Sequence, residues 1–307
     1  MTTTAYERPA GFDAFWQGVL AELAQLPMAP EMEEVPLRSS DYATVYGVRL
    51  TSIGPYRIFG YLSVPKGQGP FPARCFLPRY GSVSDLVPQG TANGQRRHYV
   101  TFSLSVRGQR RADSPYAASF PGQLTDGIDD PHTYIYRGIV ADCCRGLEYL
   151  AQRPEVDTGR IAAIGTDLAL IAAALRPRVT HLVSTPVIHH RALERAAATQ
   201  AYPLEELNDY LRLYPDRRER VANTLAHYDL AGFAPTVEAN TLLMADSGAN
   251  GVRADYLEAV AQAIHGPAQL RESEHSNYKD GAFAEVWLSE RLGMEPCLPP
   301  HWQGWAA

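Results

Sequence analysis

The sequence lacks the features that mark membrane-spanning and secreted proteins. Its longest apolar run, residues 161–175, is too short to cross a bilayer and contains Asp167. Four cysteines in 307 residues are too few for a disulfide framework. The first residues do not form the charged segment and apolar core of a signal peptide. We therefore expect a cytoplasmic protein that neither spans nor binds a membrane.

Positive charge is also scarce. The chain has 28 Lys and Arg against 34 Asp and Glu, a formal net charge of −6, and no run of basic residues. This balance predicts that nucleic acid is not a partner. The adjacent histidines His189 and His190 point apart, and neighbouring cysteines on a helix cannot share one metal ion. We expect neither a metal nor another cofactor.

The hydrophobic pattern predicts an α/β protein. Apolar residues at helical spacing indicate a helix over 11–26, and a period of two indicates a β-hairpin over 42–64. From residue 73 onward, short apolar strands alternate with helices, which is typical of a mostly parallel sheet covered on both faces. We expect one domain over 1–307. Its extension is the N-terminal helix and hairpin of residues 10–65, and a helical insertion occupies about 190–230.

One strand–turn–helix segment organises the functional hypotheses. Residues 161–165 form an apolar strand, and Gly165 and Ala169 are small enough for the strand and the next helix to approach closely. This spacing is typical of the nucleophile elbow of α/β-hydrolases, which usually has a serine at its centre. Here the central residue is Asp167. The alternative is an ordinary helix start, at which Thr166 or Asp167 bonds to free main-chain N–H groups.

Seven segments spread over the chain occur together in one known family. They are residues 11–16, 58–65, 107–109, 127–137, 154–162, 177–179 and 224–233. Through them the chain resembles the acetyl xylan esterase / cephalosporin-C deacetylase group of α/β-hydrolases (carbohydrate esterase family seven) over nearly its whole length. The resemblance implies a three-layer α/β/α sandwich, a cytoplasmic location and homo-oligomers, typically hexamers. It also implies small acetylated sugars or similar esters as the ancestral substrates.

The family's catalytic residues carry over unevenly. Asp167 stands at the nucleophile position, so the serine of the family's Gly-Gly-Ser-Gln-Gly elbow is missing, and the helix that follows is shorter. His275 fits the family's histidine. The family spacing places the catalytic acid at Ala249, beside Asn250, and leaves Asp246 at the end of strand 241–245 as a substitute.

The remaining family motifs concern the loops around the site. Tyr80 is the tyrosine of the oxyanion loop, and Leu168 follows the nucleophile position. The resemblance implies that both belong to the oxyanion site or pocket. The motif Arg107-Gly108-Gln109 is intact and implies a structural role, with Asp130 or Asp142 as ion-pair partner.

Several functions are compatible with these residues. Esterase chemistry needs a hydroxyl nucleophile, whereas attack by Asp167 would give a mixed anhydride and add negative charge where the oxyanion develops. We therefore predict a catalytically degenerate homologue that keeps a pocket for an acetylated sugar or similar ester. One alternative is a hydrolase with Asp167 as nucleophile and His275 activating water, as in haloalkane dehalogenases and epoxide hydrolases. There are two further alternatives. One is residual carbohydrate esterase activity, and the other is general acid/base chemistry by Asp167 and His275.

The hypotheses predict different geometries. An elbow gives Asp167 a strained main-chain conformation and places His275 within reach of it. In a working nucleophile the oxygens of Asp167 face an open pocket, while Asp246 holds His275. In a degenerate site Asp167 pairs with His275 or caps its helix.

Overall fold

The computed structural model describes residues 6–81, 87, 94–112, 118–248 and 251–301. Its centre is a nine-stranded sheet with the order β1-β2-β3-β5-β4-β6-β7-β8-β9. Strands β1, β2, β3 and β5 pair antiparallel, and all pairs from β5–β4 to β8–β9 are parallel. The strands are β1 (Glu31–Glu34), β2 (Ala43–Ser52), β3 (Tyr56–Pro65), β4 (Phe71–Phe76), β5 (Val100–Ser105), β6 (Val156–Gly165), β7 (His181–Ser184), β8 (Asn240–Ala245) and β9 (Ala268–Glu272).

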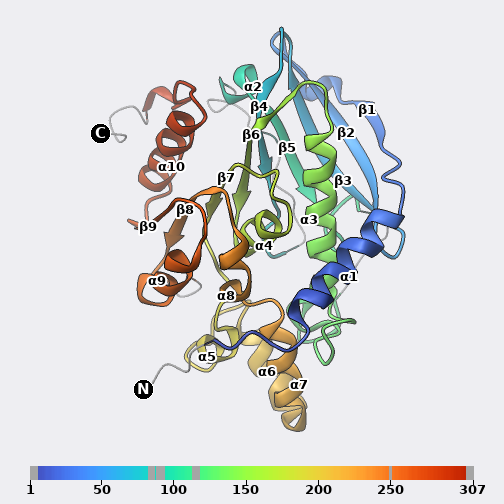
Figure 1. Ribbon diagram of the computed structural model, residues 1–307, viewed down its shortest axis with the longest axis vertical. Coiled ribbons are helices and arrows are strands. Elements are labelled where there is room, and N and C mark those ends of the chain that lie inside the picture. Colours follow the sequence, from blue (N-terminus) through green and yellow to red (C-terminus); the bar gives the residue numbers. More distant parts are fainter. Residues whose placement is uncertain (1–5, 82–86, 88–93, 113–117, 249–250, 302–307) are drawn as a thin grey trace.

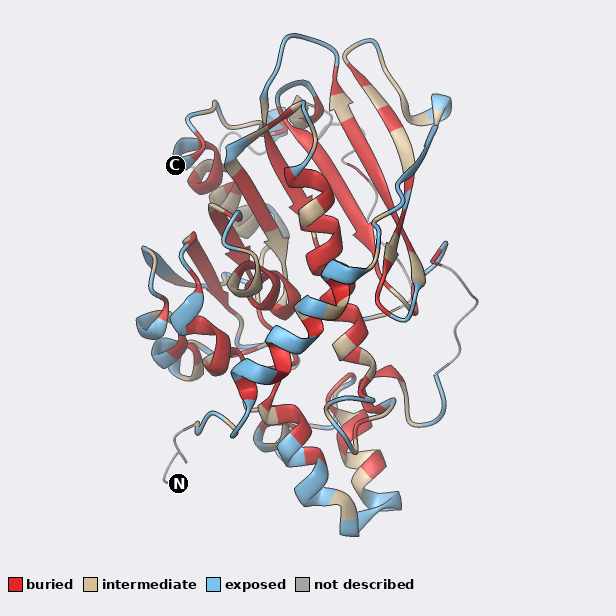
Figure 2. Ribbon diagram, turned by 45° about the vertical axis from the view of Figure 1, so that its right-hand side comes forward, coloured by how far each residue is buried: buried red, intermediate tan, exposed pale blue. Residues whose placement is uncertain are grey.

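Helices cover both faces of this sheet (Figures 1 and 2). In β8, Leu242 and Met244 join the hydrophobic cluster beneath α10 (Asn277–Arg291). Leu243 and Ala245 belong to the larger cluster with α3 (Ile135–Ala151), α4 (Asp167–Leu175) and α9 (Ala254–Ala263). Successive side chains of a strand point to opposite faces, so a continuous apolar strand needs cover on both sides. The predicted three-layer α/β/α arrangement is confirmed.

The N-terminal part follows the hydrophobic pattern closely. Helix α1 (Phe12–Gln25) buries its aromatic face, and β2 and β3 form the predicted hairpin. Strand β1 was not predicted, because its sequence Glu-Met-Glu-Glu is exposed throughout and has no apolar alternation. The short helix α2 (Gln95–His98) was not predicted either.

A group of helices follows the carboxyl end of β7. They are α5 (Ala192–Ala196), α6 (Glu205–Leu213), α7 (Arg218–Ala226) and α8 (Leu230–Phe233). These helices form the helical insertion that the sequence predicts at about 190–230, and within it Glu206 is only 3% exposed. Glu206 therefore faces the body of the protein, close to the loops in which the sequence places the site.

No helix among the described residues is long and apolar enough to cross a membrane.

Candidate functional site

The predicted site residues lie where the parallel strands end. Tyr80 follows β4, Arg107 follows β5 and Asp167 follows β6, while Asp246 and His275 follow β8 and β9. Ligand sites of open α/β sheets lie at this edge, because the loops that leave parallel strands converge there. The predicted site residues therefore gather at one edge of the sheet.

Asp167 is a buried anchor for the loop after β7. Its side chain is almost fully buried, at 2% exposed. Oδ1 accepts hydrogen bonds from the main-chain N–H groups of Ile188 (3.0 Å) and His189 (2.7 Å). Oδ2 accepts from Val187 (2.9 Å) and Ile188 (3.0 Å). Both carboxylate oxygens are thus occupied by three consecutive peptide groups.

The main chain at Asp167 is not strained. Asp167 is the first residue of the regular helix α4, and it is not one of the non-glycine residues with positive φ. Asp167 does not cap the helix either, since Thr166 occupies the N-cap position and makes no capping bond through its side chain. The prediction of a strained elbow at Asp167 is wrong, and so is the prediction that Asp167 caps α4 or pairs with His275. The carboxylate instead accepts hydrogen bonds from the main chain of the loop after β7.

Arg195 of α5 binds the other side of the same loop. Its guanidinium donates to the carbonyls of Val187 (2.8 Å) and His190 (3.3 Å) and to that of Gly251 beyond β8 (2.9 Å). Burial lowers the pKa of Arg195, and the negative charge of Asp167 opposes that shift. The loop thus presents its N–H groups to a carboxylate and carbonyl groups to a guanidinium. This arrangement compensates the buried charge of Asp167 without a direct ion pair.

Asp246 and His275 meet in an exposed position at the same edge. The imidazole Nδ1 lies 3.3 Å from Asp246 Oδ1, and the two side chains are 54% (His275) and 35% (Asp246) exposed. His275 Nε2 lies 2.8 Å from the hydroxyl of Ser247. The sequence identified Asp246 as a substitute acid but overlooked Ser247, whose only local signal is its place directly after Asp246. Residues 249–250, which include Ala249 and Asn250, lie outside the described residues.

Tyr80 is tied to the helical insertion. Its hydroxyl donates to Glu206 Oε1, and Glu206 Oε2 accepts from the main-chain N–H of Leu124 (2.8 Å). Burial raises the pKa of Glu206, and the two hydrogen bonds partly offset that rise. Tyr80 as a whole residue is still 37% exposed. Tyr80 is therefore fixed in position and accessible. We call the edge of the sheet that holds Tyr80, Asp246 and His275 the rim.

The other predicted residues are structural. Leu168 is 6% exposed and belongs to the main core, so its side chain does not line an open pocket. Arg107 donates from Nε (2.9 Å) and Nη2 (2.8 Å) to the fully buried carboxylate of Asp142, one of its two expected partners. Gln109 Nε2 binds the carbonyls on either side of Tyr80, those of Arg79 (3.1 Å) and Gly81 (3.0 Å). Gly108 has φ 83°, a conformation that favours glycine.

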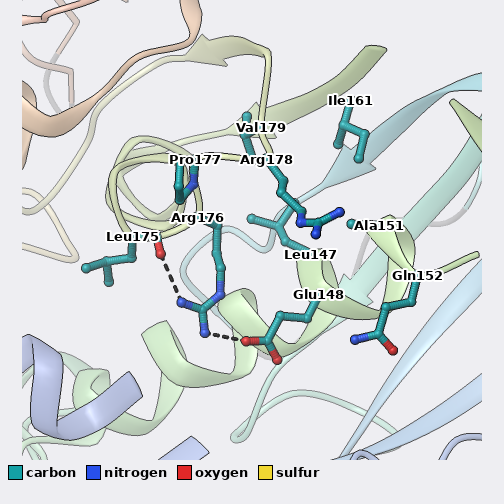
Figure 3. Close-up of a pocket in the computed structure, with 10 residues that line it drawn as sticks. All are labelled: Leu147, Glu148, Ala151, Gln152, Ile161, Leu175, Arg176, Pro177, Arg178 and Val179. Carbon is teal, nitrogen blue, oxygen red and sulfur yellow. Dashed lines mark hydrogen bonds and ion pairs between the residues drawn. The ribbon is translucent and has the colours of Figure 1, made fainter. Parts of the chain in front are cut away.

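A cavity of about 350 Å³ lies away from this edge (Figure 3). Leu147 and Ala151 of α3, Ile161 of β6 and Leu175 at the end of α4 line it. At the mouth of this cavity, Arg176 bridges the carbonyl of Leu175 (2.9 Å) and the carboxylate of Glu148 (2.5 Å). The end of α4 leads back to the start of β7, so this cavity opens at the opposite edge of the sheet from Asp246 and His275.

Comparisons with known proteins agree with this architecture. The family model for acetyl xylan esterase (AXE1) matches residues 3–248. Acetyl esterase Axe7A of Xylanibacter ruminicola is 26% identical over 243 residues, which are 74% of this chain and 54% of the relative. The chain therefore spans about half the length of that relative.

Two solved structures share the fold at 22% sequence identity. An acetyl xylan esterase from Paenibacillus sp. R4 superposes with a TM-score of 0.82 over 94% of this chain and 96% of its own. Acetyl xylan esterase 1 from Thermoanaerobacterium sp. JW/SL YS485 gives 0.80 over 92% and 94%. These likenesses confirm the predicted α/β-hydrolase fold. With the family model matched over most of its length, the chain belongs to the acetyl xylan esterase family.

Proposed function

We propose that this family member is degenerate as a serine esterase at the elbow and binds an acetylated sugar or similar ester at the rim. The proposal rests on the burial and the hydrogen bonds of Asp167. The residue at the nucleophile position is buried, and both of its oxygens accept main-chain hydrogen bonds. It stabilises the loop after β7 and is not presented to a substrate.

The same contacts argue against Asp167 as the nucleophile of a dehalogenase-like or epoxide-hydrolase-like enzyme. An attacking oxygen must approach the substrate carbon to about 3–3.5 Å with a free lone pair. Freeing Asp167 would leave the buried N–H groups of Ile188 and His189 and the partly buried N–H of Val187 unsatisfied, at about 1–3 kcal/mol for each buried group. A catalytic cycle that broke these bonds at every turnover would carry a large added barrier.

The rim nevertheless keeps groups suited to a sugar ester. The partly exposed ring of Tyr80 offers an apolar face, and the exposed Asp246–His275 pair offers both donors and acceptors. Aromatic faces and a few fixed polar groups are typical of small-molecule sites. Gln109 and Glu206 hold Tyr80 from both sides, so its position does not depend on a ligand.

Acetate release from tri-O-acetylated xylose tests the catalytic half of this proposal. We expect no release above the rate in buffer, and no covalent adduct on Asp167 with epoxide or haloalkane probes by mass spectrometry. Turnover at ordinary esterase rates that Asp167→Asn abolishes in folded protein would overturn it.

Binding of the same sugar, measured by calorimetry, tests the other half. Unmodified xylose is the matched control ligand. We expect Tyr80→Ala to weaken binding by about tenfold, the loss of one good aromatic contact. Equal affinity in the wild type and the variant would remove the rim from the proposal.

A further inference from the structure

Three side chains beyond β8 and β9 form a chain of contacts that the elbow does not use. The hydroxyl of Ser247 lies 2.8 Å from His275 Nε2, and His275 Nδ1 lies 3.3 Å from Asp246 Oδ1. We assign the imidazole proton to Nδ1, which faces the carboxylate. Nε2 then accepts a hydrogen bond from the Ser247 hydroxyl. We propose that Ser247 is the nucleophile of an exposed Ser247–His275–Asp246 triad that accepts acyl groups from small activated esters.

The structure holds His275 in an unusual main-chain conformation. His275 has φ 55°, in the left-handed region that non-glycine residues rarely adopt. Its N–H donates to the Ser273 hydroxyl (3.0 Å), which donates to Asp280 (2.7 Å). Asp280 also accepts the N–H groups of Glu274 (3.0 Å) and Ser276 (3.2 Å). Such a conformation persists only where its surroundings determine it, and it is common at functional sites. The turn therefore presents the imidazole to Ser247.

The carboxylate is positioned as well. Asp246 directly follows β8, and its Oδ1 accepts the N–H of Gly248 (2.8 Å). A carboxylate beside Nδ1 fixes the tautomer and stabilises the imidazolium that forms during the reaction. Asp246 is the orienting group of the triad, and Ser247 is the next residue along the chain.

The reaction follows from these positions. The Ser247 oxygen attacks the ester carbonyl while its proton passes to His275 Nε2. As the intermediate collapses and the ester C–O bond breaks, His275 gives that proton to the departing alcohol. His275 then takes a proton from water while the water oxygen attacks the acyl-serine. As the bond between the acyl carbon and the Ser247 oxygen breaks, His275 returns that proton to the Ser247 oxygen, which gives the carboxylic acid and free Ser247. No other reactant is needed. Because the triad is exposed, water screens the charges, so we expect slow acylation that favours esters with good leaving groups.

Peptide mass spectrometry after exposure to p-nitrophenyl acetate locates the acyl group. We expect one acetyl group on Ser247, and a labelling rate about 100-fold lower in His275→Ala because the general base is lost. Ser247→Ala should carry no label at this peptide, and Asp246→Asn should label more slowly than the wild type. Ser119→Ala, which changes an exposed serine elsewhere, is the matched control and should label like the wild type.

Label on another residue, or a rate that His275→Ala leaves unchanged, would overturn the triad. Circular dichroism melting of each variant identifies those that fail to fold. His275→Gln, which keeps a side chain that can hydrogen-bond but not a base, replaces His275→Ala if the latter unfolds. The inference shares the Asp246–His275 pair with the proposed function, but the two are tested by different variants. Ester turnover that is lost in folded Asp167→Asn contradicts the degenerate elbow, whereas turnover that is lost in Ser247→Ala supports the triad and leaves the degenerate elbow intact.

Discussion

Two carboxylates that directly follow parallel strands have opposite environments in this protein. Asp167, after β6, is 2% exposed and accepts hydrogen bonds from three consecutive peptide groups. Asp246, after β8, has a side chain 35% exposed, and among the described residues it faces the imidazole of His275 and accepts the N–H of Gly248. Equivalent positions on the sheet therefore do not imply equivalent chemistry. The loop that packs over the strand end decides whether the carboxylate is structural or reactive.

Removing each carboxylate is the strongest test of this contrast. Asp167→Ala leaves two buried N–H groups and one partly buried N–H group without partners, so we expect it to lower the free energy of unfolding by about 3–5 kcal/mol. Asp246→Ala should lower it by less than about 1 kcal/mol, because exposed pairs contribute little. Urea titrations of both variants measure the two values. Similar losses for the two variants would contradict the assignment of Asp167 as the structural carboxylate.

Arg195 sharpens the contrast from the other side of the loop. Arg195→Met removes the donor to the carbonyls of Val187, His190 and Gly251, and we expect a loss of about 2–3 kcal/mol by urea titration. Arg253→Met is the matched control, since its ion pair with Asp255 is exposed, and should cost less than about 0.5 kcal/mol. If Asp167 and Arg195 act on one loop, the double variant with Asp167→Asn will depart from additivity by about 0.5–3 kcal/mol. Strict additivity would show that the two charges act independently.

The smallest expected effect is on the pH dependence of unfolding, and it differs between two neighbouring glutamates of α6. Burial raises the pKa of Glu206, so the folded state binds its proton more tightly than the unfolded chain does. This contribution to stability is complete below the ordinary glutamate pKa and is lost as the pH rises through the raised value. Glu206→Gln should therefore flatten the pH dependence of unfolding above the ordinary glutamate pKa.

Glu205 provides the internal control for Glu206. Hydrogen bonds from Asn208 and Arg212 lower the pKa of Glu205, so its contribution to stability is present above the ordinary glutamate pKa and is lost as the pH falls. Glu205→Gln should change the slope in the opposite direction to Glu206→Gln. Slopes of the same sign would mean that Glu206 is not buried against Tyr80 and Leu124 as the structure has it.

The sequence predicted site residues that the structure gathers at one edge of the sheet, but it did not predict the contacts that those residues make. Asp246 and His275 each follow a parallel strand next to the other, so their meeting follows from the strand order, which a family resemblance can supply. Ser247 was overlooked because a serine in a polar turn is common and its hydrogen bond to His275 spans 28 residues. Glu206 and Arg195 were not predicted as site residues. Their helices are rich in charged residues, and nothing in the local sequence distinguishes the few charged side chains that become buried.

The sequence by itself determined the α/β/α layers of this protein. The spacing of apolar residues along each strand and helix shows which faces must be buried against another layer. The sequence also determined that the elbow serine is absent. Only the tertiary structure decided what Asp167 does, since its partners lie 20–22 residues away and are peptide N–H groups. Every residue except proline carries such a group, so no side-chain pattern records where it points; that direction is fixed only when the loop folds between Asp167 and Arg195.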